Sequence, residues 1–261
     1  MGILEAIILG AIQGLTEFLP VSSSGHLVLA QRLLQLEPGD LSFEVAVHGG
    51  TLLAVVVYFR ERIKSLVFSV FGLTPDPAQR QKDTQTLLHI VIGTIPAVVL
   101  GLAFKEEIEL LFASPLAVSI ALIVTGMWLL SMRLVRARQQ PLTNSRALII
   151  GLAQAAAIMP GISRSGATIA TGSMLGVAAA QAAEFSFLLS IPAVFGANLL
   201  AIPEAMTFGR FGAMHVIGAL AAALVGYISI RWVFAAIRHG NFQWFGVYCL
   251  VIGTVSTILF L

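Results

Sequence analysis

The sequence predicts an all-α polytopic membrane protein, with six transmembrane helices and two re-entrant helical hairpins arranged as an inverted-topology repeat. Three observations support this prediction. The first is composition, because 57% of the 261 residues are hydrophobic, only 11% are charged and the mean hydropathy is +0.93. Such values are typical of polytopic membrane proteins and not of soluble domains. The second is a series of long apolar segments, and the third is an internal repeat of two broken, serine-rich segments.

Six apolar segments are long enough to cross a bilayer. Three lie in each half of the chain, at 44–60, 87–104 and 115–132 and then at 185–202, 213–230 and 242–261. The whole chain, 1–261, is therefore expected to form a single integral membrane domain. No cleavable signal is expected, because the first basic residue is Arg32 and Glu5 occupies the place of a basic leader.

Two further units are apolar but interrupted. Residues 3–19 and 22–36 are two short arms separated by Leu19–Gly25, and residues 147–159 and 164–180 repeat this pattern around Pro160–Gly166. Arms of about 13–17 residues, broken by Pro, Gly and Ser, are short for independent spans. We therefore expect two re-entrant hairpins, 3–36 and 147–180, whose irregular backbone must lie inside protein or beside water.

The two halves of the chain align with each other. At an offset of 141 residues, identical residue types fall on 6/147, 10/151, 13/154, 22/163, 24/165 and 25/166. At an offset of 125 residues, Ile92, Gly93 and Gly101 match positions 217, 218 and 226. Repeat 1, about 1–132, and repeat 2, about 147–261, are thus each one hairpin followed by three spans. An odd number of spans in a repeat inverts the second copy relative to the first.

Basic residues are distributed unevenly among the predicted loops. Loops 60–86, 133–146 and 231–241 carry eleven Lys and Arg residues, whereas loops 105–114 and 203–212 carry Lys105 and Arg210. The positive-inside rule places the first set in the cytoplasm and both termini outside. The hairpins then enter from opposite faces, so their tips can meet near the midplane. The net charge of +2 gives no reason to expect nucleic acid, and the single Cys249 excludes an intramolecular disulfide and a cysteine metal cluster.

Arg164 is the only basic residue across 147–200. An arginine at the centre of a membrane helix costs about 2.5–3.5 kcal/mol on insertion scales, so it needs a compensating partner. Pro160 and Gly161 end one helix, and the next one begins with hydroxyl groups and unpaired backbone N–H donors. This combination predicts an anion site, for which phosphate is the best fit, built from Ser163, Arg164, Ser165, Gly166 and Thr168.

The first hairpin supplies a different set of polar residues. Gln13 and Glu17 lie four apart and therefore on one helix face. An unpaired carboxylate inside a membrane is expensive, which favours a functional Glu17, and imidazole is suited to proton transfer near neutral pH. The tip then carries Ser22, Ser23, Ser24 and His26.

Two alternatives apply to these polar residues. Ser22, Ser163 and Ser165 can instead be helix caps, and for Ser22 the cap is the better interpretation. His48, within the segment 44–60, is expected to be structural.

These two tips resemble the motifs of a known family. The segment Gln13–His26 (QGLTEFLPVSSSGH) is similar to the (Glu/Gln)-x-x-x-Glu segment of the undecaprenyl-diphosphate phosphatases, the bacitracin-resistance integral membrane proteins. The segment Pro160–Thr168 (PGISRSGAT) matches their Pro-Gly-x-Ser-Arg-Ser-x-x-Thr motif at every fixed position. The resemblance extends along the whole chain. Gln13 stands where the family also has Glu, so this position need not ionise.

The resemblance implies hydrolysis of undecaprenyl diphosphate to undecaprenyl phosphate and inorganic phosphate. This reaction recycles the lipid carrier for peptidoglycan synthesis and gives bacitracin resistance. The resemblance also implies a divalent cation, Mg²⁺ or Ca²⁺, bound with the diphosphate, and a polyprenyl diphosphate lipid as partner in the bacterial inner membrane. A homodimer is compatible with it. The residues that it implies as the working set are Glu17, His26, Arg164 and the tip serines.

Phosphoryl transfer requires positioning and charge neutralisation above all. Arg164 is expected to clamp the diphosphate oxygens, and Glu17 either to bind the cation or to act as a base. His26 is a candidate general acid or base. Ser23, His26 and water all stay open as the nucleophile. Further substrate contacts are expected from Gln13, Ser22, Ser24, Ser163, Ser165, Gly166 and Thr168.

A transporter or lipid flippase is the alternative function. Inverted repeats with broken helices at the midplane are also transporter architecture, and an anion-binding arginine serves transport as well as hydrolysis. Glu17 and His26 facing the anion site favour the enzyme, because an anion carrier gains little from an adjacent carboxylate.

Overall fold

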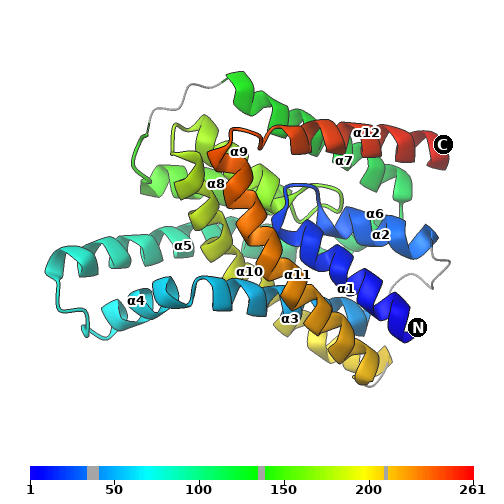
Figure 1. Ribbon diagram of the computed structural model, residues 1–261, viewed down its shortest axis with the longest axis horizontal. Coiled ribbons are helices and arrows are strands. Elements are labelled where there is room, and N and C mark those ends of the chain that lie inside the picture. The colour runs from blue at the N-terminus through cyan, green and yellow to red at the C-terminus, as the bar shows by residue number, and fades with distance from the viewer. Residues whose placement is uncertain (34–40, 135–138, 209–210) are drawn as a thin grey trace.

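The computed structural model describes residues 1–33, 41–134, 139–208 and 211–261 (Figure 1). Within these ranges the chain is all-helical, as predicted, with one short 3₁₀ turn at Met132–Leu134. The helices are α1 (Ile3–Phe18), α2 (Ser23–Leu33), α3 (Leu41–Tyr58), α4 (Arg60–Val70), α5 (Pro77–Ala103), α6 (Lys105–Phe112), α7 (Pro115–Ser131), α8 (Asn144–Ala156), α9 (Arg164–Met174), α10 (Ala179–Phe208), α11 (Ala213–Arg238) and α12 (Trp244–Phe260).

Four of the described helices are long and apolar enough to cross a membrane, namely α3, α5, α10 and α11. Helices α10 and α11 contain the whole of the predicted segments 185–202 and 213–230. Helices α3 and α5 contain all but the last one or two residues of 44–60 and 87–104. The segments 115–132 and 242–261 form α7 and α12, which have 17 residues each. Helix α7 reaches span length only together with α6, which meets it at 98°. The chain is therefore a helical membrane protein with four or five candidate spans.

Several predicted loops are helical, which corrects the boundaries drawn from apolar runs. The segment 60–86 contains α4 and the start of α5, α10 continues past Pro203, and α11 continues through Arg231. Apolar runs mark only the part of a helix that faces lipid, whereas caps mark where it begins. The Asp76 side chain accepts a hydrogen bond from the N–H of Ala78 (2.9 Å) ahead of Pro77, and this fixes the start of α5.

The two segments predicted as re-entrant hairpins are each a pair of short helices in contact, α1–α2 and α8–α9. The second arm of the second hairpin ends at Met174, earlier than the predicted residue 180, because α10 already begins at Ala179. Residues 34–36 of the first hairpin, and parts of loops 133–146 and 203–212, lie outside the described residues. The second tip requires Gly161, whose φ of +92° is left-handed and whose added Cβ would lie 2.3 Å from the carbonyl oxygen of Val118.

Each hairpin packs against a helix from the other half of the chain. Helix α1 lies on α11, where a Cβ on Gly10 would come within 2.3 Å of the Gly218 carbonyl oxygen. Helix α8 lies on α5, where a Cβ on Gly151 would come within 2.4 Å of the Gly93 carbonyl oxygen. These are the glycines that the sequence alignment pairs, 10 with 151 and 93 with 218. Helices this close need glycine at the contact.

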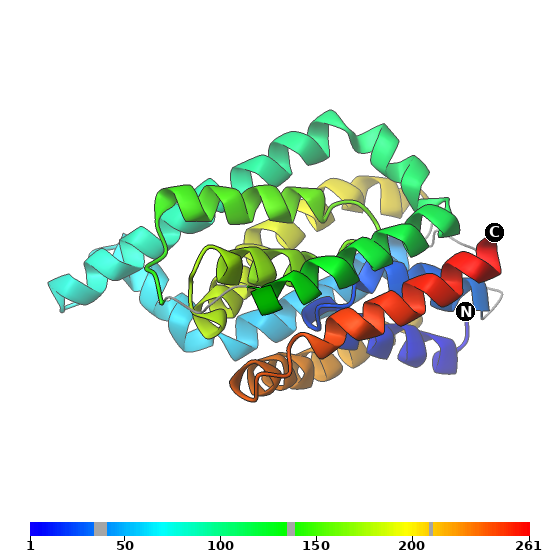
Figure 2. The ribbon, with the colours of Figure 1, turned by 90° about the horizontal axis from the view of Figure 1, so that it is seen from above.

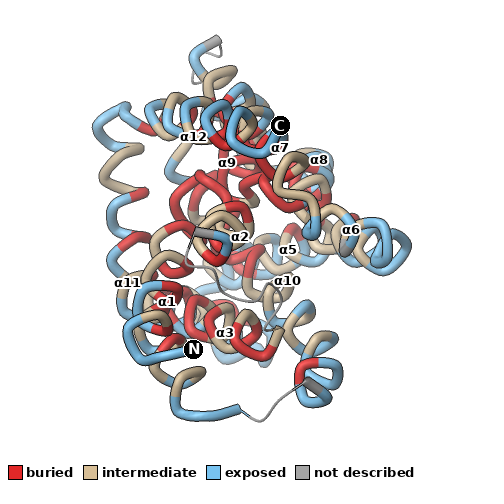
Figure 3. The backbone as a smooth tube through the Cα atoms, turned by 90° about the vertical axis from the view of Figure 1, so that its right-hand side faces the viewer, coloured by how far each residue is buried: buried red, intermediate tan, exposed pale blue. Residues whose placement is uncertain are grey.

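The remaining helices enclose the hairpins. Helices α7 and α12 run side by side (Figures 1 and 2), and both chain ends lie at one end of the molecule, opposite the turn between α4 and α5. Figure 3 shows the buried backbone gathered in the centre, around α9, with exposed backbone on the outer helices. Along α5 the exposed side is apolar over one continuous stripe, as expected of a lipid-facing surface, formed by Leu88, Val91, Ile95, Val98 and Leu102.

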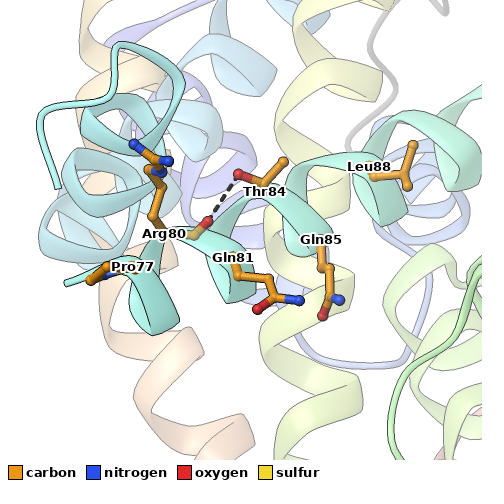
Figure 4. A pocket seen from close by; sticks show the side chains of 6 residues that line it. All are labelled: Pro77, Arg80, Gln81, Thr84, Gln85 and Leu88. Carbon is orange, nitrogen blue, oxygen red and sulfur yellow. Dashed lines mark hydrogen bonds between the residues drawn. The ribbon is translucent and has the colours of Figure 1, made fainter.

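The polar end of α5 carries two local features outside the hairpins. Asp83 is fully buried and joins α4 to α5 by accepting hydrogen bonds from Ser65 (2.6 Å) and Ser69 (2.9 Å) and by pairing with Arg62. A shallow hollow of about 290 Å³ is lined entirely by residues of α5 (Figure 4), which are Pro77, Arg80, Gln81, Thr84, Gln85 and Leu88. It contains no hairpin residue and plays no part in the site described below.

Replacing Gly151 by alanine should destabilise the protein, because the new methyl group would overlap the Gly93 carbonyl. Overpacking of this kind costs about 1–3 kcal/mol and should lower the Tm of the purified protein in detergent by several degrees. The matched control is Gly196→Ala in α10, where an added Cβ meets nothing within 4 Å. An equal Tm for the two variants would contradict the close α5–α8 contact.

Candidate active site at the hairpin tips

The tips of the two hairpins meet. Arg164 at the start of α9 donates from Nη2 to Oε1 of Glu17 on α1 over 2.5 Å. The Ser165 hydroxyl donates to the carbonyl oxygen of Leu19 over 3.2 Å, and a Cβ on Gly166 would lie 3.3 Å from Cβ of Pro20. Residues nearly 150 positions apart in the sequence thus form one site, as the predicted entry of the hairpins requires.

Glu17 is the centre of this site. Its second carboxylate oxygen, Oε2, accepts hydrogen bonds from the Ser23 hydroxyl (2.6 Å) and from Nε2 of Gln13 (3.1 Å). The side chains of Glu17 and Arg164 are only 8% and 14% exposed. A buried charge is tolerated when it is paired and hydrogen-bonded, and Glu17 meets both conditions. The structure therefore brings together four of the predicted residues, Gln13, Glu17, Ser23 and Arg164.

Two polar atoms of this cluster are buried and have no hydrogen-bond partner in the described chain, Nη1 of Arg164 and Oε1 of Gln13. Each such group costs about 1–3 kcal/mol when it stays unpaired, which is uncommon without a functional reason. Nη1 can only donate, so it suits an anionic oxygen. Oε1 can only accept, so it suits a hydroxyl group or a cation.

Several tip serines build the turns. Ser22, whose φ is +69°, accepts a hydrogen bond at Oγ from the N–H of Gly25 (3.3 Å) and lies 3.3 Å from the Ser24 hydroxyl. Ser163 is the N-cap of α9 and accepts from the N–H of Gly166 over 3.1 Å. The helix-cap interpretation is confirmed for Ser22 and Ser163, at matching positions of the two hairpins.

Thr168 does not join the Glu17 cluster through its hydroxyl. That group donates to the backbone carbonyl of Arg164 (2.7 Å) and lies 2.6 Å from the Ser186 hydroxyl on α10, in a fully buried position. Since Thr168 follows Arg164 by one helical turn, it faces the α9–α10 contact. It holds α9 in place below the arginine.

His26 also lies apart from the ion pair. Its Nδ1 is 2.8 Å from the Ser22 carbonyl oxygen, and its Nε2 is 2.8 Å from the hydroxyl of Tyr248 on α12. Among the described residues neither hydrogen bond reaches Glu17 or Arg164. His26 nevertheless follows Ser23 by three residues on α2, so the two side chains are neighbours on one helix face.

The sequence analysis missed three contributors. The hydroxyl of Thr125 on α7 accepts from the N–H of Ser163 (3.0 Å) and donates to the Gly161 carbonyl (2.9 Å), which satisfies the second turn. Ser186 contacts Thr168, and Tyr248 contacts His26. A lone polar residue in an apolar span carries no sequence signal for such a role. The repeat alignment does give a signal for Gln154, the counterpart of Gln13, whose buried amide has no partner in the described chain.

The oxygen atoms of the site fit a cation that shares its ligands with a phosphate. In the described ranges no group of three His, Cys, Asp or Glu side chains could hold a metal ion. Glu17 and Oε1 of Gln13 offer one carboxylate and one amide oxygen. Mg²⁺ is commonly bound through one or two carboxylates together with substrate phosphates, so this donor set matches that mode and not a closed metal cage.

His48, expected to be structural, contacts the Glu44 carbonyl oxygen within α3 through its Nδ1 (2.8 Å).

The apolar helices define the class, which is an integral membrane protein, and the buried Arg164, whose Nη1 donor is unpaired within the described ranges, makes the hairpin tips a candidate anion site. Comparison with known proteins identifies the family. The family described as bacitracin resistance protein BacA matches residues 6–255, so the chain belongs to this family.

Full-length relatives agree with this assignment. An undecaprenyl-diphosphatase of Desulfosudis oleivorans is 41% identical and one of Korarchaeum cryptofilum is 41% identical, each with 97% of both chains covered. Undecaprenyl-diphosphatase 1 of Bacillus cereus is 39% identical, with 99% of this chain and 98% of the relative covered. The resemblance inferred from the two tip motifs is therefore confirmed.

Proposed function

We propose that this protein is an undecaprenyl-diphosphatase, which hydrolyses undecaprenyl diphosphate to undecaprenyl phosphate and inorganic phosphate. The observation that carries the proposal is the Arg164–Glu17 pair between the hairpins, with a second guanidinium donor left for an anion. Relatives that carry this name are similar over nearly the whole chain. Membership of the bacitracin resistance family supports a role in cell-wall lipid recycling and resistance to bacitracin.

Arg164 binds the diphosphate in this proposal. Nη1 donates to a phosphate oxygen while Nη2 stays on Glu17, and backbone N–H groups at the start of α9 add partial positive charge. Phosphoryl transfer depends mainly on such positioning and charge neutralisation. Glu17 keeps the guanidinium in one orientation before the substrate arrives, so little reorganisation is needed during the reaction.

Glu17 also prepares the attacking group. The Ser23 hydroxyl already donates to Oε2 over 2.6 Å, so the carboxylate can take the proton as the serine oxygen attacks the terminal phosphorus. This attack breaks the P–O–P bond and releases undecaprenyl phosphate, and water then hydrolyses the phosphoserine to inorganic phosphate and free serine. The same geometry can activate a water bound beside Ser23. His26 is a proton donor or acceptor one helical turn away.

A divalent cation completes the charge balance. Mg²⁺ or Ca²⁺ would neutralise negative charge on the diphosphate when bound. In the alternative in which Glu17 binds the cation instead of acting as the base, its carboxylate and Oε1 of Gln13 would hold the cation, because these are the two acceptor oxygens of the cluster that suit a divalent ion. The Ser24 hydroxyl at the first tip is the next contact proposed for the diphosphate oxygens, whereas the Ser165 hydroxyl would first have to give up its hydrogen bond to the Leu19 carbonyl oxygen.

The full architecture proposed is six spans and two re-entrant hairpins in an inverted repeat, within 1–261 as one domain. The contacts Gly10–Gly218 and Gly151–Gly93 support it. The sequence alignment pairs Gly10 with Gly151 and Gly93 with Gly218, so each contact is the counterpart of the other in the opposite half. Both chain ends lie opposite the turn between α4 and α5, whose flanking helices carry Arg60, Arg62, Lys64, Arg80 and Lys82. By the positive-inside rule that turn is cytoplasmic, so the termini are external in the inner membrane.

A lipid transporter would use the same anion site. The activity named for the relatives favours hydrolysis. A carboxylate 2.6 Å from a serine hydroxyl also suits a hydrolase, whereas an anion carrier gains little from it unless it couples protons.

Purified protein in detergent should release phosphate from a polyprenyl diphosphate when Mg²⁺ or Ca²⁺ is present. Release should fall at least about a hundredfold in Arg164→Ala and in Glu17→Ala, equal to about 2.7 kcal/mol of transition-state stabilisation. The matched control is Arg60→Ala, since that side chain lies at the start of α4, is 71% exposed and belongs to neither hairpin. Tight substrate binding without release by the wild type would instead identify a carrier.

The topology can be tested with single cysteines in a Cys249→Ala background. Pro141→Cys, in the loop 133–146, should not react with impermeant thiol reagents added to intact cells, because that loop is expected in the cytoplasm. Glu106→Cys, in the loop 105–114, should react. The reverse labelling pattern would overturn the proposed orientation.

A further inference from the structure

The two hydrogen bonds of His26 define which ring nitrogen carries the proton. The Ser22 carbonyl oxygen can only accept, so Nδ1 donates to it and bears the hydrogen. In the neutral ring Nε2 is then the basic nitrogen, and it accepts from the hydroxyl of Tyr248 over 2.8 Å. The two rings are nearly parallel, with an interplanar angle of 11° and centroids 5.6 Å apart.

Packing of α12 keeps Tyr248 beside His26. The next residue, Cys249, is fully buried, and its thiol lies 3.5 Å from the Pro20 carbonyl oxygen at the first hairpin tip. On its other side α12 is held against α7, where a Cβ on Gly246 would come within 2.9 Å of the Gly126 carbonyl oxygen. The position of the phenol relative to the hairpin is therefore set by the backbone and not by a flexible loop.

This arrangement leaves the imidazole one route for exchanging a proton. Nδ1 is committed to a carbonyl that cannot supply or take one, whereas the Tyr248 hydroxyl both donates and accepts. Tyr248 is 43% exposed and lies on the same side of α12 as the exposed Trp244, Val251 and Val255, so its hydroxyl can also meet an oxygen atom of a lipid substrate. Any proton that His26 gains or loses at Nε2 passes through this hydroxyl.

We propose that Tyr248 of α12 is the positioning residue of His26 and the group that relays its proton. In the alternative in which Glu17 holds the cation and is not the base, the phenol takes a proton from the water or hydroxyl group being activated as it passes its own proton to Nε2. The phenol stays neutral and His26 becomes an imidazolium. When the leaving oxygen needs a proton, the two transfers run in reverse. The same hydroxyl holds the ring in both states, as acceptor when Nε2 is protonated and as donor when it is not.

The proposal rests on the proposed phosphatase function, and phosphate release tests it through three variants, Tyr248→Phe, His26→Gln and the double variant. Tyr248→Phe keeps the ring and removes only the hydroxyl. We expect it to lower kcat at least tenfold with KM within twofold. We expect the double variant to be as slow as His26→Gln, because residues acting as a unit are not additive. The proton inventory in H₂O and D₂O mixtures should change from curved to linear.

The control is Tyr227→Phe, which removes a hydroxyl that accepts from Arg231 on the same helix and bonds no hairpin residue in the described ranges, so kcat and KM should stay unchanged. A kcat for Tyr248→Phe within twofold of the wild type, or a double variant that loses the product of the two single losses, would overturn the relay.

A second readout does not depend on activity. The ¹⁵N resonance of the His26 Nε2, assigned by its absence in His26→Gln, should shift in Tyr248→Phe and not in Tyr227→Phe. An unchanged resonance would overturn the hydrogen bond itself, whereas inactive wild-type protein with a shifted resonance would count against the phosphatase alone.

Discussion

The pairing of Arg164 with Glu17 is the constraint on which the site depends. Neither charge would be stable alone at its depth, because an unpaired buried ion costs several kcal/mol. The two residues lie on different hairpins, so each hairpin is stabilised in place by the charge of the other. The pair leaves one guanidinium donor, Nη1, without a partner among the described residues. The two charges of the pair cancel, so the site is neutral by itself and suits a diphosphate that binds together with a divalent cation.

The rest of the fold brings these two charges together. Broken helices are tolerated within a membrane only where protein satisfies their backbone, and here Thr125 and Ser163 do so at the second tip. Glycine contacts allow α1 and α8 to lie directly on helices of the opposite half. The hydroxyls that cap the turns are thus part of the scaffold, and the atoms available for chemistry are fewer than the serine-rich sequence suggests.

The sequence predicts the all-helical class, the two hairpins and the central cluster well, because each has a local signal. Proline, glycine and serine mark the breaks, and a lone arginine in an apolar region requires a partner. Helix ends are predicted less well, because an apolar run covers only the lipid-facing part of a helix. Helix α5 begins before its apolar run, and α11 continues beyond the end of its own. The contacts of Thr125, Ser186 and Tyr248 depend on tertiary packing alone. For the same reason His26, expected to face Arg164, instead contacts α12.

The most direct test of the account is whether the two tips touch in the membrane. Pro20→Cys and Gly166→Cys, introduced together with Cys249→Ala, place the only two thiols of the chain on facing tips, where the Cβ positions are 3.3 Å apart. This separation is close to that of a disulfide. The account predicts that mild oxidation in native membranes links the two peptides within one chain, as detected by mass spectrometry after proteolysis. Two free thiols after oxidation, or crosslinks only between chains, would contradict it.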